Sequence, residues 1–438
     1  MGHFAEGYIY VPPHIIARSE PLYHDGWIAF NSKTSTTFEL TAAEYFLLEE
    51  LQETGLPASD FSRIWPLVCG KDTAEERSAL LLDGGVLHWS DNPIAGALRK
   101  KRTPRLRDDK SNSLAFLSSP TELELCITRR CNQTCFHCNV SAVSLKKREK
   151  SDTDFWINLL DQAEEQRVLR VTLTGGEPFS RRDFTEILTH ISRKPFATIL
   201  LTNGTLISDD QIGLIRGGSI TLSVSIDGVD GQQHDSFRRS PGAFDATLRT
   251  LRRLNEAGIQ FVISSVLHEG NVACATEFLT LANKVGAARL VVVPISAVGR
   301  AKSLGSSGQF PLRERMSNAI TSLRRAAMET PGLDVIIGNP DPAVRELVTI
   351  KDRHSGATAM SKRNPGLCKA GVYSMAVDED GSAYSCLRGL QERIYPIGNL
   401  KSQTLAEVWS TLGWNEFRDT NKPMVPCRVE EIGSRRRS

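Results

Sequence analysis

Cys131-Asn-Gln-Thr-Cys135-Phe-His-Cys138 is the stretch around which the rest of the chain is arranged, because it places three thiols close together. It directly follows an apolar run, residues 123–127, that is typical of a buried strand. Thiolates are soft ligands, and close-set cysteines suit an iron–sulfur cluster. A cubane has four irons, so three cysteines would leave one iron open to a ligand that is not protein. The spacing is unlike the paired cysteines of a tetrahedral zinc site, although a zinc knuckle or three buried thiols remain alternatives.

The chain length and amino-acid composition are typical of a globular protein with more than one domain. The chain has 438 residues, of which 40% are hydrophobic and 24% charged, and its net charge of +2 argues against a nucleic-acid partner. No stretch approaches the length of a membrane span, and the N-terminus lacks an apolar signal-peptide core, so we expect no membrane partner and a cytoplasmic location. The nine cysteines are an odd number, and their grouping predicts metal ligands in a reducing compartment rather than disulfides.

From Glu122 onward, apolar strand-like runs alternate with amphipathic helical patterns. Residues 151–166 predict a helix opened by Ser151-x-x-Asp154, residues 243–257 predict another that stops at Gly258, and Asn271 is expected to cap a third. This alternation predicts an α/β fold with a parallel sheet and right-handed crossovers, either a partial (β/α)6 barrel or a doubly wound sheet. The six predicted strands are residues 123–127, 171–174, 198–202, 221–226, 261–267 and 290–294.

The polar motifs favour the barrel, because each falls at the C-terminal end of a predicted strand, where barrel enzymes place their chemistry. In chain order these are the cysteine loop, Gly175-Gly176-Glu177-Pro178, Thr202-Asn203-Gly204, then Ser223, Ser225 and Asp227, and finally Pro294.

The Gly-Gly-Glu stretch has a physical interpretation. Gly175 and Gly176 would let the backbone approach a ligand closely, and Glu177 offers an anion to an ammonium group. Alone, such a stretch is equally typical of a plain strand-to-loop turn. Its position one strand–helix unit after the cysteine loop makes the combination specific.

Together these two motifs resemble the signature of the radical S-adenosylmethionine (radical SAM) enzymes. The resemblance implies that Cys131, Cys135 and Cys138 hold a [4Fe–4S] cluster whose open iron chelates the amino and carboxylate groups of SAM. One electron from the cluster then cleaves the sulfonium, and the released 5′-deoxyadenosyl radical abstracts hydrogen. It also implies the partial barrel and a role for Glu177 on the methionyl amine. The family usually has an aromatic residue just before the third cysteine, where this chain has His137.

Three further residues resemble SAM contacts of the family. Ser225 and Arg238 match its SAM-contacting Ser and Arg, and Arg238 could form a charge-assisted pair with the SAM carboxylate. Asn203 could contact the adenosine. The alternatives are a solvent-facing loop arginine and an asparagine that only holds its turn. We assign no catalytic residue beyond the cluster ligands.

Residues 1–95 predict a small winged-helix-like domain. Strand-like runs at 8–11 and 27–31 precede a helix opened by the capping box Thr41-Ala-Ala-Glu44, helices at 59–67 and 73–82, and a strand at 86–89. This order resembles the recognition element of enzymes that modify ribosomally made peptides. It implies capture of a leader peptide as an added strand. A structural cap or a DNA-binding winged helix are the alternatives, and residues 96–119 are expected to form a linker.

The C-terminal third predicts a connecting helical segment at residues 301–365 and an iron–sulfur extension at 366–438. Cys368 is followed by twelve residues, Gly381, four residues and Cys386, and Cys427 comes later. This spacing resembles the auxiliary-cluster extension called SPASM, or twitch in its shorter form. It implies an auxiliary iron–sulfur cluster on Cys368, Cys386 and Cys427, with a hairpin turned at Asp380-Gly381. Three unrelated thiols are the alternative, and the remaining cysteines, Cys69, Cys126 and Cys274, are expected in the core.

The resemblance implies a radical SAM enzyme that modifies a precursor peptide carrying a leader, by thioether or carbon–carbon cross-linking. It would take its electrons from a reductant such as flavodoxin or ferredoxin. An enzyme of small-molecule cofactor or haem biosynthesis and a non-catalytic peptide-binding iron–sulfur protein remain alternatives.

Overall fold

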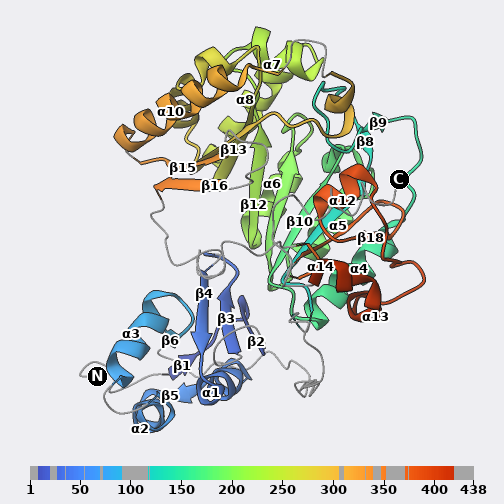
Figure 1. Cartoon of the computed structure of the whole chain (residues 1–438). Coiled ribbons are helices and arrows are strands. Elements are labelled where there is room, and N and C mark those ends of the chain that lie inside the picture. Colours follow the sequence, from blue (N-terminus) through green and yellow to red (C-terminus); the bar gives the residue numbers. More distant parts are fainter. Residues whose placement is uncertain are drawn as a thin grey trace.

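The protein is seen in a computed structural model, drawn in Figure 1. The structure describes residues 8–19, 27–34, 36–53, 55–69, 73–90, 117, 119–304, 310–330, 332–338, 347–351, 370–372 and 374–418.

One large, mostly parallel sheet organises the α/β fold. All six predicted strands are present, and each pairs in parallel with the strand that follows it along the chain. A doubly wound sheet reverses its strand order at a switch point, whereas this order runs in one direction. The sheet therefore winds one way and curves into a partial barrel. The strands are β7 (Glu122–Thr128), β10 (Arg170–Gly175), β11 (Ala197–Thr202), β12 (Ile220–Ser225), β13 (Phe261–Leu267) and β14 (Arg289–Pro294).

The sheet continues at both edges beyond these strands. After β14 come β15 (Asp334–Gly338), which is parallel, and β16 (Leu347–Lys351), which is antiparallel. At the other edge, β17 (Ser374–Val377) pairs in parallel with β7. The C-terminal region is thereby built onto the barrel sheet, an addition that the sequence did not predict.

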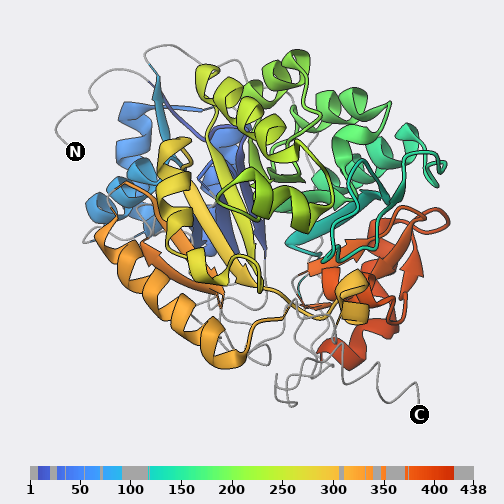
Figure 2. The same cartoon turned by 90° about the horizontal axis from the view of Figure 1, so that it is seen from above.

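Helices cover the outside of the curved sheet, as the view from above shows (Figure 2). Along β13, Phe261, Ile263 and Leu267 are buried, whereas Val262 and Val266 between them stay half-exposed. This alternation gives β13 one packed face and one more open face. The helices are α4 (Thr153–Glu165), α5 (Phe184–Ile191), α6 (Asp209–Gly217), α7 (Gly231–Arg238), α8 (Ala243–Glu256), α9 (Glu277–Lys284) and α10 (Arg313–Glu329).

Two predicted helix starts are wrong. The cap of α4 is Asp152, whose carboxylate accepts from the Phe155 amide at 3.0 Å, while the Ser151 hydroxyl donates to the Glu379 carbonyl at 2.6 Å. Asn271 stands at the N-cap position of a single 3-10 turn, Val272–Cys274, but makes no side-chain capping bond, because its side-chain amide donates to the carbonyls of Asp227 and Val266. In both cases the predicted capping side chain donates its hydrogen bond to a backbone carbonyl that is far away in the sequence, that of Glu379 or Asp227.

The N-terminal unit has its own core and two small sheets. The capping box holds as predicted, with the Thr41 amide donating to Glu44 at 2.8 Å and the Glu44 amide donating to the Thr41 hydroxyl at 3.2 Å. One sheet has the order β5-β1-β6 and the other β2-β3-β4. The elements are β1 (Tyr8–Tyr10), β2 (Ile15–Ser19), β3 (Trp27–Asn31), β4 (Thr36–Leu40), α1 (Ala42–Glu53), β5 (Leu56–Pro57), α2 (Ala58–Cys69), α3 (Ala74–Asp83) and β6 (His88–Ser90).

Arg167 is one of the residues that join this unit to the barrel, and Ile16, Ile28 and Phe30 of its sheet pack in the hydrophobic core of the barrel. Arg167 lies between α4 and β10 in a left-handed conformation, with φ of 53°. Its guanidinium donates to the Ala17 carbonyl at 2.7 Å and to the Tyr45 hydroxyl at 2.6 Å, and it pairs with Glu49 at 2.7 Å. Because Arg167 precedes β10, the N-terminal unit is attached at the N-terminal ends of the barrel strands.

The C-terminal elements include the predicted hairpin. Antiparallel strands β17 and β18 (Ser382–Tyr384) turn at Asp380-Gly381, and Gly381 has the positive φ of 83° that favours glycine. After it come α12 (Leu387–Glu392), β19 (Gly398–Asn399), α13 (Leu405–Ser410) and α14 (Asn415–Arg418). Among the described residues, no helix is both long enough and apolar enough to cross a membrane.

Candidate functional site

The cysteine loop begins where β7 ends and lies at the C-terminal end of the barrel. Backbone amides point at two of its sulfur atoms: Gln133 N lies 3.4 Å from Cys131 Sγ, and Ala142 N lies 3.2 Å from Cys138 Sγ. The Cys135 side chain is buried. Amide hydrogen bonds to sulfur stabilise thiolates and tune cluster potentials, so this loop is prepared to hold its sulfurs in the charged form.

Without a metal the thiols of Cys131 and Cys135 stay protonated. Burial, with the Glu177 carboxylate adding to it, raises the pKa of Cys131 to about 12, and burial likewise raises the pKa of Cys135. A bound metal would displace these protons. In the part of the chain that the structure describes, no three His, Cys, Asp or Glu side chains close around the position of a single ion. Three cysteine thiolates on one loop are a ligand set that an iron–sulfur cluster uses, so the chemistry of these residues fits such a group.

The glycines of the Gly-Gly-Glu stretch pack against the cysteine loop itself. A Cβ on Gly175 would lie 2.1 Å from the Thr128 carbonyl oxygen, and one on Gly176 would lie 2.0 Å from the Arg130 carbonyl oxygen. The amide of Glu177 donates to that same Arg130 oxygen at 2.8 Å. The close approach that requires glycine is thus between two backbones, whereas the sequence had suggested an approach to a ligand.

Glu177 is fully buried at the end of β10. Its carboxylate accepts hydrogen bonds from the amides of Phe179 at 3.2 Å and Asn203 at 2.7 Å, and from the Thr202 hydroxyl at 2.8 Å. Burial still raises the pKa of Glu177 to about 7. A nearby cation would favour the charged form, so the site suits an ammonium ligand.

Asn203 connects the end of β11 to the cysteine loop. Its side-chain nitrogen Nδ2 donates to Asn132 Oδ1 at 2.9 Å, and its side-chain oxygen Oδ1 accepts from the Thr205 amide at 2.9 Å. Asn203 Nδ2 also lies 4.0 Å from Cys131 Sγ. Asn203 therefore holds its own turn and stands beside a cysteine at the same time.

Arg238 is buried beside the cysteine loop rather than facing solvent. Its guanidinium pairs with the buried Asp227 at 2.7 Å and donates to Gln133 Oε1 at 3.1 Å. Burial alone would raise the pKa of Asp227, but Arg238 and neighbouring groups lower it to about 2. Ser225 is half-buried at the end of β12, opposite Ser264 of β13.

An aromatic stack beside the loop was missed by the sequence analysis. The His137 ring stacks on Phe237 with centroids 4.5 Å apart, and Phe237 stacks on His268 with centroids 3.5 Å apart. Burial lowers the pKa of His137 to about 4, so its ring is neutral at pH 7. The sequence did contain a signal for this stack, since His137 fills the position where the family usually has an aromatic residue.

The predicted auxiliary site is described only in part. Cys386 is half-buried directly before α12, and the next amide, Leu387 N, donates to Glu124 Oε2 at 2.7 Å. Cys368 and Cys427 lie outside the described residues. Cys126 is fully buried in the barrel.

Two family models match the chain. Residues 125–280 match the radical SAM superfamily, and residues 368–429 match SPASM, an iron–sulfur cluster-binding domain. The chain therefore carries a radical SAM domain followed by a SPASM domain, and it is a radical SAM enzyme. Its cofactors are a SAM-binding [4Fe–4S] cluster, SAM and an auxiliary iron–sulfur cluster.

Curated relatives differ in their activities. The chain is 26% identical over 328 residues to the AdoMet-dependent heme synthase of Methanosarcina barkeri, covering 73% of this chain and 90% of the relative. It is 25% identical over 321 residues to the PqqA peptide cyclase of Methylocella silvestris, covering 72% of this chain and 81% of the relative.

Solved structures share the fold. Streptococcus suis SuiB bound to precursor peptide SuiA superposes with a TM-score of 0.69 at 20% identity, covering 94% of this chain and 90% of SuiB. The enzyme anSMEcpe with bound AdoMet superposes with a TM-score of 0.53 at 15% identity, covering 68% of this chain and 82% of the other.

Proposed function

We propose that this enzyme modifies a ribosomally made precursor peptide, forming a thioether or carbon–carbon cross-link after radical hydrogen abstraction. The observation that carries the proposal is the sheet β2-β3-β4, whose β4 edge pairs with no further strand among the described residues and which Arg167 helps attach to the radical SAM barrel. SuiB, whose fold covers 94% of the chain, is bound to its precursor peptide, and the PqqA cyclase acts on a peptide.

Cys131, Cys135 and Cys138 would hold the SAM-binding cluster, which when bound supplies the electron that cleaves SAM. Glu177 receives the methionyl amine, whose positive charge favours the ionised carboxylate. Asp227 fixes the Arg238 guanidinium beside the loop, where it can meet the SAM carboxylate. Gly175 and Gly176 position the loop, while Asn203 and Ser225 face the adenosine side.

The leader peptide would dock on β4. Carbonyls at the outer edge of β2 are occupied, because Ile15 O accepts from the Gln52 side chain at 2.8 Å and Ala17 O accepts from Arg167. Strand β4 is the other edge of this sheet, and Arg77 of α3 donates to the Glu39 carbonyl there. An extended peptide can add to such an edge through main-chain hydrogen bonds.

The C-terminal region would hold the auxiliary cluster through Cys368, Cys386 and Cys427, close to the barrel because β17 is hydrogen-bonded to β7. A reductant such as flavodoxin or ferredoxin and a cytoplasmic location complete the proposal. It requires neither a nucleic-acid nor a membrane partner.

A second candidate is synthesis of haem or another small cofactor, favoured by the likeness to the heme synthase over 73% of the chain. Such a substrate needs no leader-binding edge. Peptide binding at β4 therefore separates the two candidates.

The test uses a labelled precursor peptide encoded beside the gene and measures its dissociation constant by fluorescence anisotropy. Thr37→Pro should weaken binding at least about tenfold, because proline removes a main-chain donor from β4. Thr37→Val keeps that donor and should bind like the wild type. Equal affinities for all three proteins, or no mass change in the peptide after anaerobic turnover with SAM, would contradict the proposal.

A further inference from the structure

An exposed strand lies directly beside the cysteine loop. β9 (Val143–Ser144) pairs in parallel with β8 (Arg130–Cys131), and Ser144 is the register partner of Cys131. The Val143 amide donates to the Arg129 carbonyl at 2.6 Å. Paired strands lie about 5 Å apart. The surface at β9 is thus separated from a proposed cluster ligand by a single strand spacing.

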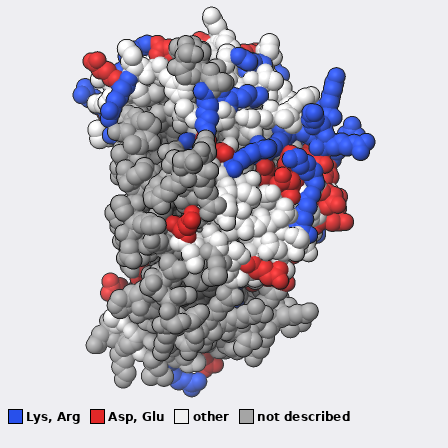
Figure 3. All heavy atoms as spheres, turned by 45° about the vertical axis from the view of Figure 1, so that its right-hand side comes forward, with Lys and Arg blue, Asp and Glu red and all other residues white. Residues whose placement is uncertain are grey.

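The segment that continues from β9 carries uncompensated positive charge. Lys146, Lys147 and Arg148 are exposed, and none of them forms an ion pair with any residue in the described ranges. The acidic residue of the same run is turned away from them, because Glu149 pairs with Arg130 at 2.9 Å and with Arg181 at 3.4 Å. Figure 3 brings this side of the molecule forward and shows Lys and Arg side chains gathered on it, next to a group of Asp and Glu side chains.

Apolar side chains accompany these charges. Val143 is 38% exposed and Leu145 is 39% exposed, which is unusual for large hydrophobic residues in this structure. Exposed apolar groups within a charged rim are the common composition of a protein–protein contact. A run of charge without them would more often be only a solvated loop.

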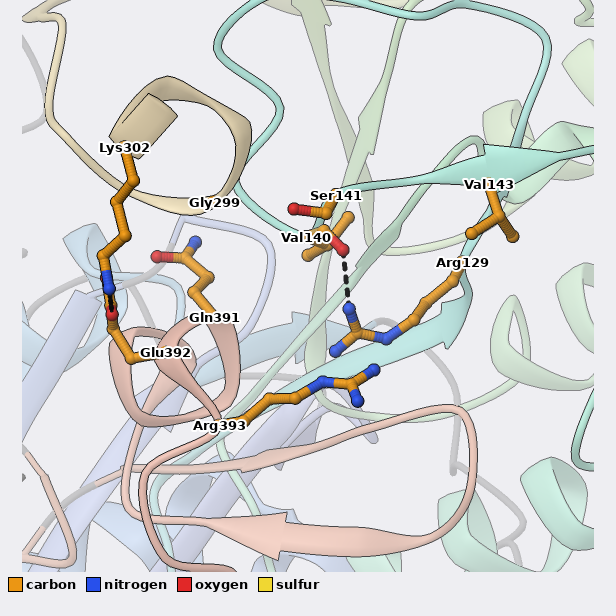
Figure 4. Close-up of a pocket in the computed structure, with 9 residues that line it drawn as sticks. All are labelled: Arg129, Val140, Ser141, Val143, Gly299, Lys302, Gln391, Glu392 and Arg393. Carbon is orange, nitrogen blue, oxygen red and sulfur yellow. Dashed lines mark hydrogen bonds and ion pairs between the residues drawn. The ribbon is translucent and has the colours of Figure 1, made fainter. Parts of the chain in front are cut away.

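A cavity of about 310 Å³ adjoins the segment (Figure 4). Two of its cations are engaged, since Arg129 pairs with Asp378 at 2.7 Å and Lys302 pairs with Glu392. Arg393 also lines the cavity, is exposed, and forms no ion pair with the residues that the structure describes. Its φ of 50° ends α12 in the left-handed region, where glycine would cost less. An arginine at this position is accounted for if its side chain binds an acidic group of a partner protein.

We propose that residues 143–150 and Arg393 form a docking surface for an acidic one-electron carrier protein of the flavodoxin type, called here the donor surface. This rests on the proposed function. Each SAM cleavage consumes one electron: the donor flavin passes from hydroquinone to semiquinone, and the C5′–S bond breaks to give methionine and the 5′-deoxyadenosyl radical. The donor surface brings that electron within one strand spacing of Cys131.

The position of the donor surface argues against a leader-binding role. The proposed leader site belongs to the N-terminal unit, which Arg167 attaches at the N-terminal end of β10. The donor surface follows the cysteine loop at the C-terminal end of β7. The two partners would therefore occupy opposite ends of the barrel and could bind together.

The test compares two reductants on the full-length reconstituted enzyme. One is an acidic bacterial flavodoxin kept reduced by its reductase and NADPH, and the other is dithionite, which needs no docking. The variant is K146E/K147E/R148E, with R393Q as a second, milder variant. R249E/R252E is the matched control, because Arg249 and Arg252 are exposed on α8. Flavodoxin affinity is measured separately by biolayer interferometry at two salt concentrations.

The triple variant should lose about tenfold or more in kcat/KM for flavodoxin-driven 5′-deoxyadenosine formation, and R393Q a smaller factor. Dithionite-driven rates should stay within about twofold of wild type. Flavodoxin affinity should fall with salt for the wild type and much less for the triple variant. Equal flavodoxin kinetics in all proteins, or weakened precursor-peptide binding with unchanged flavodoxin affinity, would overturn the donor surface. Absence of SAM cleavage by the wild type with either reductant would instead refute the proposed function.

Discussion

The Gly176 amide donates a 2.7 Å hydrogen bond to the Thr128 carbonyl oxygen, which joins the end of β10 to the last residue of β7, directly before the cysteine loop. Glu177 follows Gly176 and lies on the same short connection. The proposed amine site for SAM and the proposed cluster site are therefore parts of one hydrogen-bonded structure. A change in either backbone should alter both.

Gly176→Ala tests this connection. The added Cβ would meet the Arg130 carbonyl oxygen at 2.0 Å, so the cysteine loop must move, at a cost of about 2 kcal/mol or more. Iron and sulfide bound after anaerobic reconstitution should fall well below wild type. Gly213→Ala on α6 meets no atom within 4 Å and should keep full iron content, with stability unchanged or raised by up to about 1 kcal/mol. Wild-type iron content in Gly176→Ala would show that the close approach is dispensable.

Arg167→Ala should uncouple peptide modification from SAM cleavage. The substitution removes the bonds to Ala17 and Tyr45 and the ion pair with Glu49, all at the junction with the barrel. We expect 5′-deoxyadenosine formation within about twofold of wild type and at least about tenfold less modified peptide. Arg167→Lys should resemble alanine, because an ammonium cannot reproduce the guanidinium fork. Unchanged formation of modified peptide in both variants would show that Arg167 does not couple peptide modification to SAM cleavage.

The sequence predicted local features well and long-range ones poorly. The six strands, the Thr41 capping box and the turn at Gly381 depend on neighbouring residues, and the structure contains all of them. The addition of β17 beside β7 joins segments that are far apart in the chain. The ion pair between Arg129 and Asp378 spans 249 residues, and no local pattern encodes such a partner. The capping errors at Ser151 and Asn271 have the same cause.

His234 gives the barrel a defined sensitivity to acid. It is fully buried, with Nδ1 accepting from the Asp227 amide at 3.2 Å, and burial first, then Arg238, lower its pKa to about 4 from an ordinary 6.5. Above pH 6.5 both folded and unfolded states hold it neutral. As the pH falls from 6.5 to 4 only the unfolded state gains the proton, so stability is lost, by about 3 kcal/mol in total.

His234→Gln cannot take up that proton. The difference in unfolding free energy between wild type and variant should therefore shrink by about 3 kcal/mol between pH 7 and pH 4, measured by urea titration at each pH. Parallel pH profiles for the two proteins would show that His234 is not held neutral in the fold.

Replacing Cys368, Cys386 and Cys427 together with Ala should remove one cluster and spare the other. Iron content after reconstitution should drop by roughly four irons, and 5′-deoxyadenosine should still form while modified peptide is lost. Full iron and sulfide content in this variant would show that these residues hold no auxiliary cluster. The thioether proposal would then lose its structural basis.

The most direct measurement of the central claim is 5′-deoxyadenosine formation by the variant in which Cys131, Cys135 and Cys138 are all Ala. Wild type and variant are reconstituted anaerobically, reduced with dithionite and supplied with SAM, and the product is quantified by mass spectrometry. We predict product from the wild type and none above background from the variant. Product from the reduced triple variant would contradict the assignment of the SAM-cleaving cluster to these three cysteines.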